Sequence, residues 1–327
     1  MKICTKSLLL AASASIALVS PALAQKSVLI SDYTGDRVIR YEWPSGIVID
    51  HFVGTGITPL KQTWGSAYGL DGNLYLASYV TNQILKYNGI TGQPLGVFVA
   101  AGVGGLLNPT GITFGPDGIL YVCSYSNDLV LKYRASDGAF LGTFIAAGAG
   151  GLDGPYDIKF DGAGGAYVCS YLSDKVLKFN AATGAYVSDA VIGTQGIDGP
   201  SGIVLDKTTS TMYVSSRLND RIIQRTFAGA VSILVATGVG GLNGPIGITI
   251  APDDSLVTTA FDGRNILRFT KSGAFLGQFV GVGVGGLGNP ISILFSPDAL
   301  CPADFNQDGF VNGDDFDGFV DAFTAGC

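Results

Sequence analysis

An acidic segment close to the C-terminal end of the sequence carries the residue types and spacing of a calcium site. Side-chain oxygens recur at positions 1, 3, 5, 9 and 12 of one stretch, and glycine stands at position 6. Calcium prefers several oxygen ligands, and this spacing wraps a loop around one ion with help from a backbone carbonyl. We predict calcium as a cofactor, with these ligands: Asp304, Asn306, Asp308, the carbonyl of Phe310, Asn312 and Asp315. The alternative is an acidic tail without a bound ion.

The residues around this loop indicate a small appendix over 301–327. Four apolar residues follow the loop with the period of an α-helix, which places them on one face: Phe316, Phe319, Val320 and Phe323. Cys301 and Cys327 bracket the segment. In an exported protein, we expect this pair to form a disulfide that clasps the appendix.

A second candidate site is a set of mostly aromatic residues at one position of an internal repeat: Tyr33, Tyr79, Tyr125, Tyr171, Arg217 and Phe261. Two interpretations are open. The side chains pack between repeats, or they line the mouth of a central channel that suits sugar rings or another flat ligand. Three positions later the repeats carry Asp36, Asn82, Asp128, Asp174, Asp220 and Arg264. Asp and Asn at such places are typical of turns fixed by bonds to nearby backbone amides.

Titratable residues that could support catalysis are few. Asp157 stands where four of the other five repeats have glycine at the start of their first strand. It is either a channel ligand or acid, or the cap of a turn. The single histidine, His51, and the single glutamate, Glu42, fall away from the expected channel. No Ser-His-Asp or Cys-His set and no histidine cluster for zinc can be assembled near the axis.

The repeat predicts the elements that position these residues. One copy, 109–151, contains four apolar, β-rich runs separated by turn clusters: Gly111 to Phe114, Leu120 to Ser124, Leu129 to Tyr133 and Phe140 to Ala146. A tyrosine of the second run recurs every 46 residues, at Tyr75, Tyr121, Tyr167 and Tyr213. Four strands per repeat of this length are the signature of a propeller blade.

The register of the repeats predicts a closed ring. First strands recur at Gly65, Gly111, Asp157, Gly202, Gly247 and Ser292, and the last copy stops after its first strand. Strands two to four of that copy are found at the other end of the chain, in 28–56. We therefore expect an all-β fold: a six-bladed β-propeller of four-stranded blades whose last blade is shared between the termini. The calcium loop and its helix are added as a tail.

Equivalent positions in neighbouring blades also hold Cys123 and Cys169. In a six-fold ring such positions lie as far from each other as from the axis, which exceeds the roughly 7 Å limit between Cα atoms for a disulfide. We predict two buried free thiols. The glycine-rich segments 100–106, 146–152, 236–242 and 281–287 are expected to be crossover loops between blades.

The N-terminal residues predict export. Lys2 and Lys6 precede an apolar run from Leu8 to Val19, and small residues end the segment at Ala24, as in a Sec signal peptide. The run is too short to favour a membrane span. The expected domains are a signal peptide over 1–24, the propeller over 25–300 and the calcium tail over 301–327. The destination is the periplasm or the extracellular space.

The net charge of the sequence restricts the classes of partner that can be expected. Loss of two lysines with the signal peptide changes the formal net charge from −7 to −9. Nucleic acid and anionic lipid need a basic face, so an acidic chain argues against both. We expect a monomeric propeller whose partner is an extracellular polysaccharide or a protein.

The repeat resembles those of the NHL and streptogramin-lyase-like six-bladed propellers. The resemblance is carried by P-x-G-I-x-F, P-D-G-x-L-Y-V and N-x-I-L-K-Y, as in Pro109 to Phe114, Pro116 to Val122 and Asn82 to Tyr87. It implies the fold over 25–300. Lyases and amidating enzymes of this group use channel histidines, and gluconolactonase-like propellers use an acidic metal site that includes glutamate. Neither set stands at matching places in this sequence.

The tail looks like one dockerin repeat, with its ligand positions at the residues given above. The resemblance implies calcium binding and suggests a cohesin-like protein partner. Dockerins usually carry two repeats, and many present small hydroxyl residues where Gly313 and Asp314 stand here. We therefore expect a secreted, non-catalytic binding or scaffold propeller with a calcium tail. The alternative is a propeller lyase or lactonase-like hydrolase that acts through a metal or aspartates in the channel.

Overall fold

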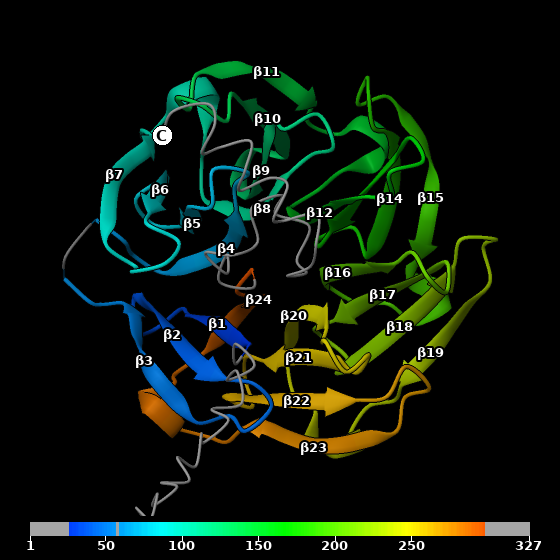
Figure 1. Cartoon of the computed structure of the whole chain (residues 1–327). Helices are drawn as coiled ribbons and strands as arrows, with labels where there is room; N and C mark the ends of the chain where they lie inside the picture. The colour runs from blue at the N-terminus through cyan, green and yellow to red at the C-terminus, as the bar shows by residue number, and fades with distance from the viewer. Residues whose placement is uncertain (1–25, 57–58, 298–327) are drawn as a thin grey trace, which may run out of the picture.

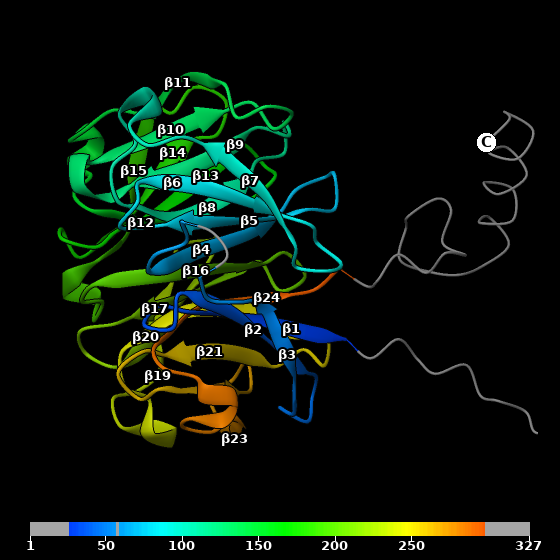
Figure 2. The ribbon, with the colours of Figure 1, turned by 90° about the vertical axis from the view of Figure 1, so that its left-hand side faces the viewer.

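The computed structural model describes residues 26–56 and 59–297, which form six four-stranded antiparallel sheets around one central axis (Figure 1). The expected all-β, six-bladed propeller is therefore confirmed. The strands of each sheet run across the thickness of the ring, so the blades form a single layer (Figure 2). The signal segment, the predicted calcium ligands and the Cys301–Cys327 pair lie outside the described residues.

Each blade uses four consecutive strands, except the blade that joins the two ends of the chain. That blade combines β24 (Pro290–Phe295) with β1 (Ser27–Asp32), β2 (Arg37–Glu42) and β3 (Val48–Val53). The next two blades are β4 (Thr63–Tyr68), β5 (Leu74–Ser78), β6 (Gln83–Tyr87), β7 (Pro94–Val99), and β8 (Pro109–Phe114), β9 (Leu120–Ser124), β10 (Leu129–Tyr133), β11 (Phe140–Ile145). The remaining three are β12 (Pro155–Phe160), β13 (Gly165–Ser170), β14 (Lys175–Asn180), β15 (Tyr186–Ile192); β16 (Pro200–Asp206), β17 (Thr211–Ser216), β18 (Arg221–Thr226), β19 (Val231–Val235); and β20 (Pro245–Ile250), β21 (Leu256–Ala260), β22 (Asn265–Phe269), β23 (Phe275–Val280).

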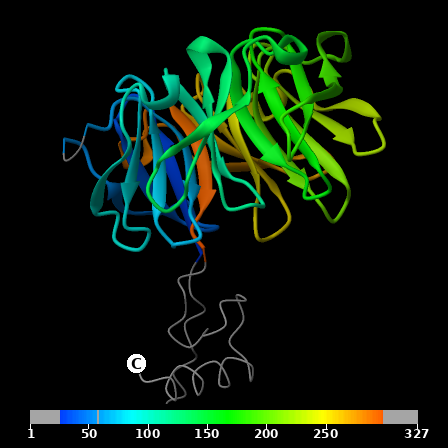
Figure 3. The ribbon, with the colours of Figure 1, turned by 90° about the horizontal axis from the view of Figure 1, so that it is seen from above.

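The shared blade closes the ring by antiparallel pairing of β24 with β1. Val28 lies opposite Phe295 and Ile30 opposite Ile293, and the N–H of Ser296 donates to the carbonyl of Ser27 at 2.9 Å. The pairing removes two strand edges that would otherwise be exposed. Because β1 begins where β24 ends, both ends of the described chain lie on the same side of the ring (Figure 3).

The crossover loops contain short 3-10 turns rather than plain coil. These turns are η1 (Val103–Gly105), η3 (Ala149–Gly151), η4 (Gly193–Gln195), η5 (Val239–Gly241) and η6 (Val284–Gly286), and η2 (Tyr125–Asn127) follows β9. Gly102 and Gly104 in the first of these loops have φ of 76° and 67°. Such left-handed backbone favours glycine, which explains the glycine-rich composition of the crossovers.

The first strands of the blades line the axis and approach one another closely. Gly65, Gly111, Gly202 and Gly247 stand at equivalent places on these strands, and a Cβ at any of them would lie 2.1–2.6 Å from atoms of the next first strand. Glycine is therefore required by close backbone approach at four of the six positions.

Two faces of the ring are distinguished below. The ring face holds the turns that follow the second strands, together with the crossover loops. The terminal face is the opposite one, where β1 begins and β24 ends. Among the described residues, no helix is long and apolar enough to cross a membrane.

Candidate functional site

The six residues predicted as a ring do converge around the axis on the ring face. The ring centroids of Tyr33 and Phe261 are 5.6 Å apart, and Tyr125 lies 6.4 Å from Tyr79 and 6.5 Å from Tyr171. Arg217 completes the circle, because its guanidinium carbon lies 4.7 Å from the centroid of the Phe261 ring. All six side chains are half-buried. They form one continuous set of contacts rather than six separate surface groups.

Two further aromatic residues, which the sequence pattern did not single out, fill the centre of this circle. Trp64 on β4 stacks on Tyr79 at 4.9 Å, and Tyr156 on β12 stacks on Tyr171 at 4.7 Å. Trp64 and Tyr156 also meet edge to face at 5.1 Å. The hydroxyl of Tyr156 accepts a hydrogen bond from Arg217 at 3.3 Å, and burial raises the pKa of Tyr156 far above its usual value.

These contacts close the channel at the ring face. In each stacked pair the partner covers one flat face of each aromatic ring, and the two central residues, Trp64 and Tyr156, are only 9% and 3% exposed. At the next chain position, three of the six blades carry an exposed aliphatic residue, since Val80, Leu172 and Leu218 are 53%, 55% and 59% exposed. The other three blades carry the polar residues Thr34, Ser126 and Asp262 at this position. The six residues of the circle together with Trp64 and Tyr156 thus form an aromatic plug, and its rim is aliphatic on three blades and polar on the other three.

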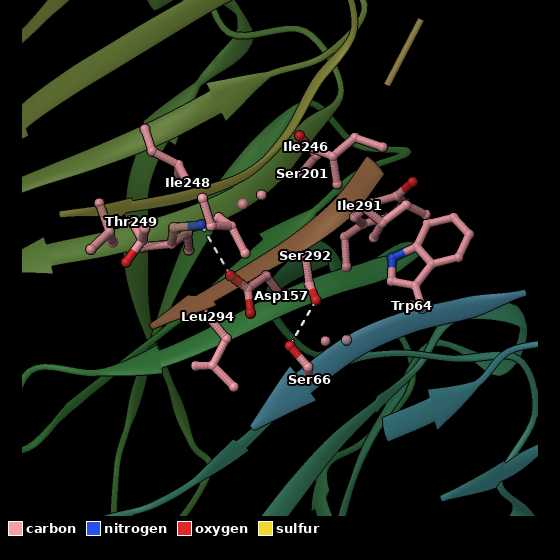
Figure 4. Close-up of a pocket in the computed structure, with 18 of the residues that line it drawn as sticks. Trp64, Ser66, Asp157, Ser201, Ile246, Ile248, Thr249, Ile291, Ser292 and Leu294 are labelled. Atoms are coloured by element: carbon pink, nitrogen blue, oxygen red, sulfur yellow. Dashed lines mark hydrogen bonds between the residues drawn. The ribbon is translucent and has the colours of Figure 1, made fainter. Parts of the chain in front are cut away.

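Below the plug, the channel contains a cavity of about 170 Å³ (Figure 4). Trp64 and Tyr156 bound it on the ring side, and Thr249 and Leu294 lie at its other end. The first strands are buried where they start and half-exposed where they end on the terminal face, except that β16 ends in the buried Asp206. The cavity is therefore approached from the terminal face and not through the aromatic ring.

Asp157 lies inside this cavity, within β12, and does not cap a turn. Its Oδ1 accepts hydrogen bonds from Lys159 Nζ at 2.8 Å and from the N–H of Ile158 at 2.9 Å. Its Oδ2 accepts from the N–H of Ile203 on the next blade at 3.0 Å (Figure 4). Of the two predicted roles of Asp157, the turn cap is therefore excluded. The residue lies in the channel, where it also joins two blades.

Asp or Asn follows the circle of aromatic residues by three positions, and each of these side chains accepts a hydrogen bond from a backbone N–H. The expectation that the bonded amide lies in the same turn was wrong. Their Oδ1 atoms accept from the N–H that leads into the next blade, 24–26 residues further on. The pairs are Asp36 with Gln62, Asn82 with Asn108, Asp128 with Gly154, Asp174 with Gly199 and Asp220 with Gly244. These contacts hold neighbouring blades together around the ring face.

The remaining candidate groups lie away from the channel. His51 is on the outer strand β3, where Nε2 contacts the carbonyl of Gly285 at 3.1 Å, and Glu42 ends β2. Cys123 and Cys169 are buried free thiols, as predicted, and burial raises the pKa of both. Within residues 26–56 and 59–297, no group of three or more His, Cys, Asp or Glu is placed to hold a metal ion.

Comparison with known proteins supports the fold. No protein-family model matches the chain, and no curated protein matches it in sequence. A chain of the nidogen/laminin complex superposes with a TM-score of 0.68 at 15% identity, over 83% of this chain and 98% of that one. Virginiamycin B lyase from Staphylococcus aureus gives 0.55 at 15% identity over 76% and 78%, and a streptogramin B lyase gives 0.52 at 16% over 76% and 71%. Streptogramin lyases are thus among the structural neighbours of this propeller.

Proposed function

We propose that this protein is an exported, non-catalytic propeller that binds another protein through its ring face. The observation that carries the proposal is the aromatic plug with Arg217 in its circle, rimmed by the exposed residues Val80, Leu172 and Leu218. Aromatic residues and arginine are enriched at the energetic centres of protein interfaces, and Leu172 and Leu218 extend the apolar surface on two neighbouring blades. A chain of similar fold takes part in the nidogen/laminin complex, which is consistent with a protein partner.

The state of Asp157 favours binding over catalysis. It is the one carboxylate among the described residues that line the cavity, and three donors already engage it. A general acid or base must exchange a proton with the substrate, whereas this carboxylate is held by an ammonium group and two backbone amides. The alternative of a lyase or lactonase-like hydrolase therefore has little support from the channel chemistry.

Export and calcium binding are part of the proposal and rest on the sequence. Residues 1–24 would direct the chain through the Sec pathway, and the acidic loop from Asp304 to Asp315 would bind calcium. The tail would then tether or orient the propeller through its apolar helix face. A cohesin-like protein is one candidate for the tail's partner.

A polysaccharide is the second candidate ligand of the ring face, since sugar rings stack on aromatic side chains. The stacking of Trp64 on Tyr79 and of Tyr156 on Tyr171 weakens this candidate, because one face of each ring is already covered and Trp64 and Tyr156 are buried. The triple variant Tyr79→Ala, Tyr125→Ala, Tyr171→Ala tests it against cellulose, xylan, mannan and chitin. Loss of wild-type polysaccharide binding in a folded triple variant would favour this second candidate.

The proposed function is tested by surface variants that leave the plug intact. The purified mature protein is immobilised and exposed to the extracellular and periplasmic proteins of the source cells, and captured proteins are quantified by mass spectrometry. Leu172→Glu combined with Leu218→Glu should abolish specific capture, because charges on the rim oppose desolvation of the interface. Leu95→Glu with Leu276→Glu is the matched control, since these residues are 54% and 50% exposed on the outer strands β7 and β23. Capture that is unaffected by the rim variant, or no capture at all, would overturn the proposal.

A further inference from the structure

The two blades that break the glycine pattern of the channel lie opposite each other. Asp157 on β12 and Ser292 on β24 occupy the place where the other four first strands have glycine. Their blades are three apart in a ring of six, so the two side chains stand on opposite walls of the cavity. The channel therefore has two polar walls, whereas the other four first strands pack closely through their backbones.

The first polar wall is the pair of Asp157 and Lys159. The Asp157 side chain is 15% exposed and Lys159 is 35% exposed, so the pair lies inside the cavity on its terminal side. Oδ2 of Asp157 has one protein donor, which leaves it able to accept a second hydrogen bond. The ammonium of Lys159 has three protons, and its bond to Asp157 uses one of them. This wall can both donate hydrogen bonds to a ligand and accept hydrogen bonds from it.

The second polar wall is a chain of three hydroxyls. Ser292 Oγ donates to Ser31 Oγ at 2.8 Å, and Ser66 Oγ lies 2.7 Å from Ser292 Oγ (Figure 4). Because a hydroxyl has a single proton, Ser292 cannot also donate to Ser66, so Ser66 is the donor of that bond. The lone pairs of Ser66 are left to accept a hydrogen bond from a ligand in the cavity.

Isoleucine side chains separate the two polar walls. Ile203, Ile246, Ile291 and Ile293 line the cavity, and Trp64 bounds it at the ring side. A cavity of about 150 Å³ holds benzene, so the volume here, about 170 Å³, has room for one six-membered ring whose further substituents extend toward the terminal face. A suitable ligand has apolar CH groups at its centre and hydroxyl groups on two opposite edges.

We propose that the channel binds one pyranose-sized sugar unit, which enters from the terminal face. Adjacent hydroxyls on one edge would accept from Lys159 and donate to Asp157, and a hydroxyl on the opposite edge would donate to Ser66. The charges of Lys159 and Asp157 compensate each other, so the site favours a neutral ligand over a free anion or cation. A purely aromatic ring would leave both polar walls without partners, which costs binding free energy.

This site is independent of the proposed partner on the ring face, because the plug of Trp64 and Tyr156 separates the two. The probes are the methyl glycosides of glucose, galactose, mannose and xylose. Binding is measured by saturation-transfer NMR and calorimetry on the full mature protein, and unfolding is followed to verify the fold of each variant. Short oligosaccharides of the same sugars form a second arm, which distinguishes a free monosaccharide from a chain end as the source of the unit.

Lys159→Met should weaken binding of the preferred glycoside by about tenfold or more, the effect of removing a charge-assisted hydrogen bond. Asp157→Asn should weaken it as well, because the amide oxygen retains the bond to Ile203 but is a neutral and therefore weaker acceptor for the sugar hydroxyl. Lys175→Met is the matched control. Lys175 belongs to the same blade, is 34% exposed and pairs with Asp189 at 2.9 Å on the outside of the ring. This control and the Leu172→Glu, Leu218→Glu variant should bind sugar like the wild type.

Absence of binding for every glycoside and oligosaccharide would overturn the inference. So would binding that survives Lys159→Met and Asp157→Asn, or that is lost in the rim variant, because the sugar would then lie elsewhere. Loss of protein capture with retained sugar binding, or the reverse, separates failure of this inference from failure of the proposed function.

Discussion

The carboxylate of Asp128 accepts a hydrogen bond from the N–H of Gly154 at 2.7 Å, and this contact joins one blade to the next. Asp128 has a φ of 59°, a left-handed conformation that aspartate and asparagine adopt more readily than other non-glycine residues. The backbone thus aims the side chain away from its own turn and toward the neighbouring blade. Four equivalent residues make the same contact, so the ring is held together near the plug by repeated polar bonds.

Asp128→Ala should lower the free energy of unfolding by about 1–3 kcal/mol, because it removes a charge-assisted bond and places alanine in left-handed backbone. Asp128→Asn should cost less, since Asn82 makes the equivalent bond to Asn108 at 2.6 Å. Urea unfolding of the two variants provides the measurement. The exposed Asp137, paired with Arg134 at 2.9 Å, is the control, and Asp137→Ala should change stability by about 0–1 kcal/mol. Equal effects of Asp128→Ala and Asp137→Ala would argue against the inter-blade role.

Deletion of residues 25–56 should abolish cooperative folding of the propeller. The deletion removes β1, β2 and β3, and leaves β24 without its partner strand. Differential scanning calorimetry of the truncated chain should show no sharp transition, because the ring is left open at two edges. An unchanged melting transition would mean that the terminal pairing of β1 with β24 does not close the fold.

Acid should weaken the propeller through Asp206, whose side chain is 3% exposed. Burial alone would raise the pKa of Asp206, but hydrogen bonds from Lys271, Thr208 and Thr209 outweigh it and hold the pKa well below its usual range. A folded-state pKa below the unfolded value near 4 contributes stability above about pH 4, which is lost as the pH falls below that value. Urea unfolding at pH 7 and pH 3 measures this loss.

Asp206→Asn supplies the comparison for the pH experiment. At pH 7 the variant should be less stable by about 1–3 kcal/mol, because Lys271 loses a charged partner 2.6 Å away. The difference between wild type and variant should shrink as the pH falls toward 3. A difference that stays constant between pH 7 and pH 3 would exclude Asp206 as a source of the acid sensitivity.

The fold could be predicted from the sequence because each blade repeats the same pattern. The predicted runs Leu120 to Ser124 and Leu129 to Tyr133 coincide with β9 and β10. Closure was predictable for a related reason, since the incomplete last repeat and the N-terminal strands add up to one blade. The structure confirms this arrangement.

The channel could not be predicted in the same way, because its features break the repeat. Trp64 and Tyr156 stand where other blades carry Thr110, Ser201, Ile246 and Ile291, so no periodic signal marks them. Their contacts exist because six first strands converge on one axis. The partners of the polar contacts between blades could not be predicted either. Each contact joins residues more than 20 positions apart, and the preferences of local turns say nothing about partners at that separation.

The tail should respond to calcium independently of the propeller. Several carboxylates in one short loop repel each other, and a bound cation relieves this repulsion. Calorimetry on the mature protein should detect calcium binding, and Asp304→Ala with Asp308→Ala should remove it. A chelator should expose protease sites between 298 and 327 while the melting transition of the propeller stays unchanged. Absence of calcium binding at millimolar concentration would contradict the proposed role of the loop.

The aromatic plug is the basis of both proposals, and thiol labelling tests it most directly. Ser201 is 2% exposed at the ring end of the cavity, and Thr249 is half-buried near the terminal face. In Thr249→Cys and Ser201→Cys variants, N-ethylmaleimide labelling at each position is timed by peptide mass spectrometry. We predict fast labelling for Thr249→Cys, slow labelling for Ser201→Cys, and faster labelling of Ser201→Cys when Tyr79→Ala and Tyr171→Ala open the plug. Equally fast labelling of both positions with the aromatic plug intact would contradict a channel that is closed at the ring face.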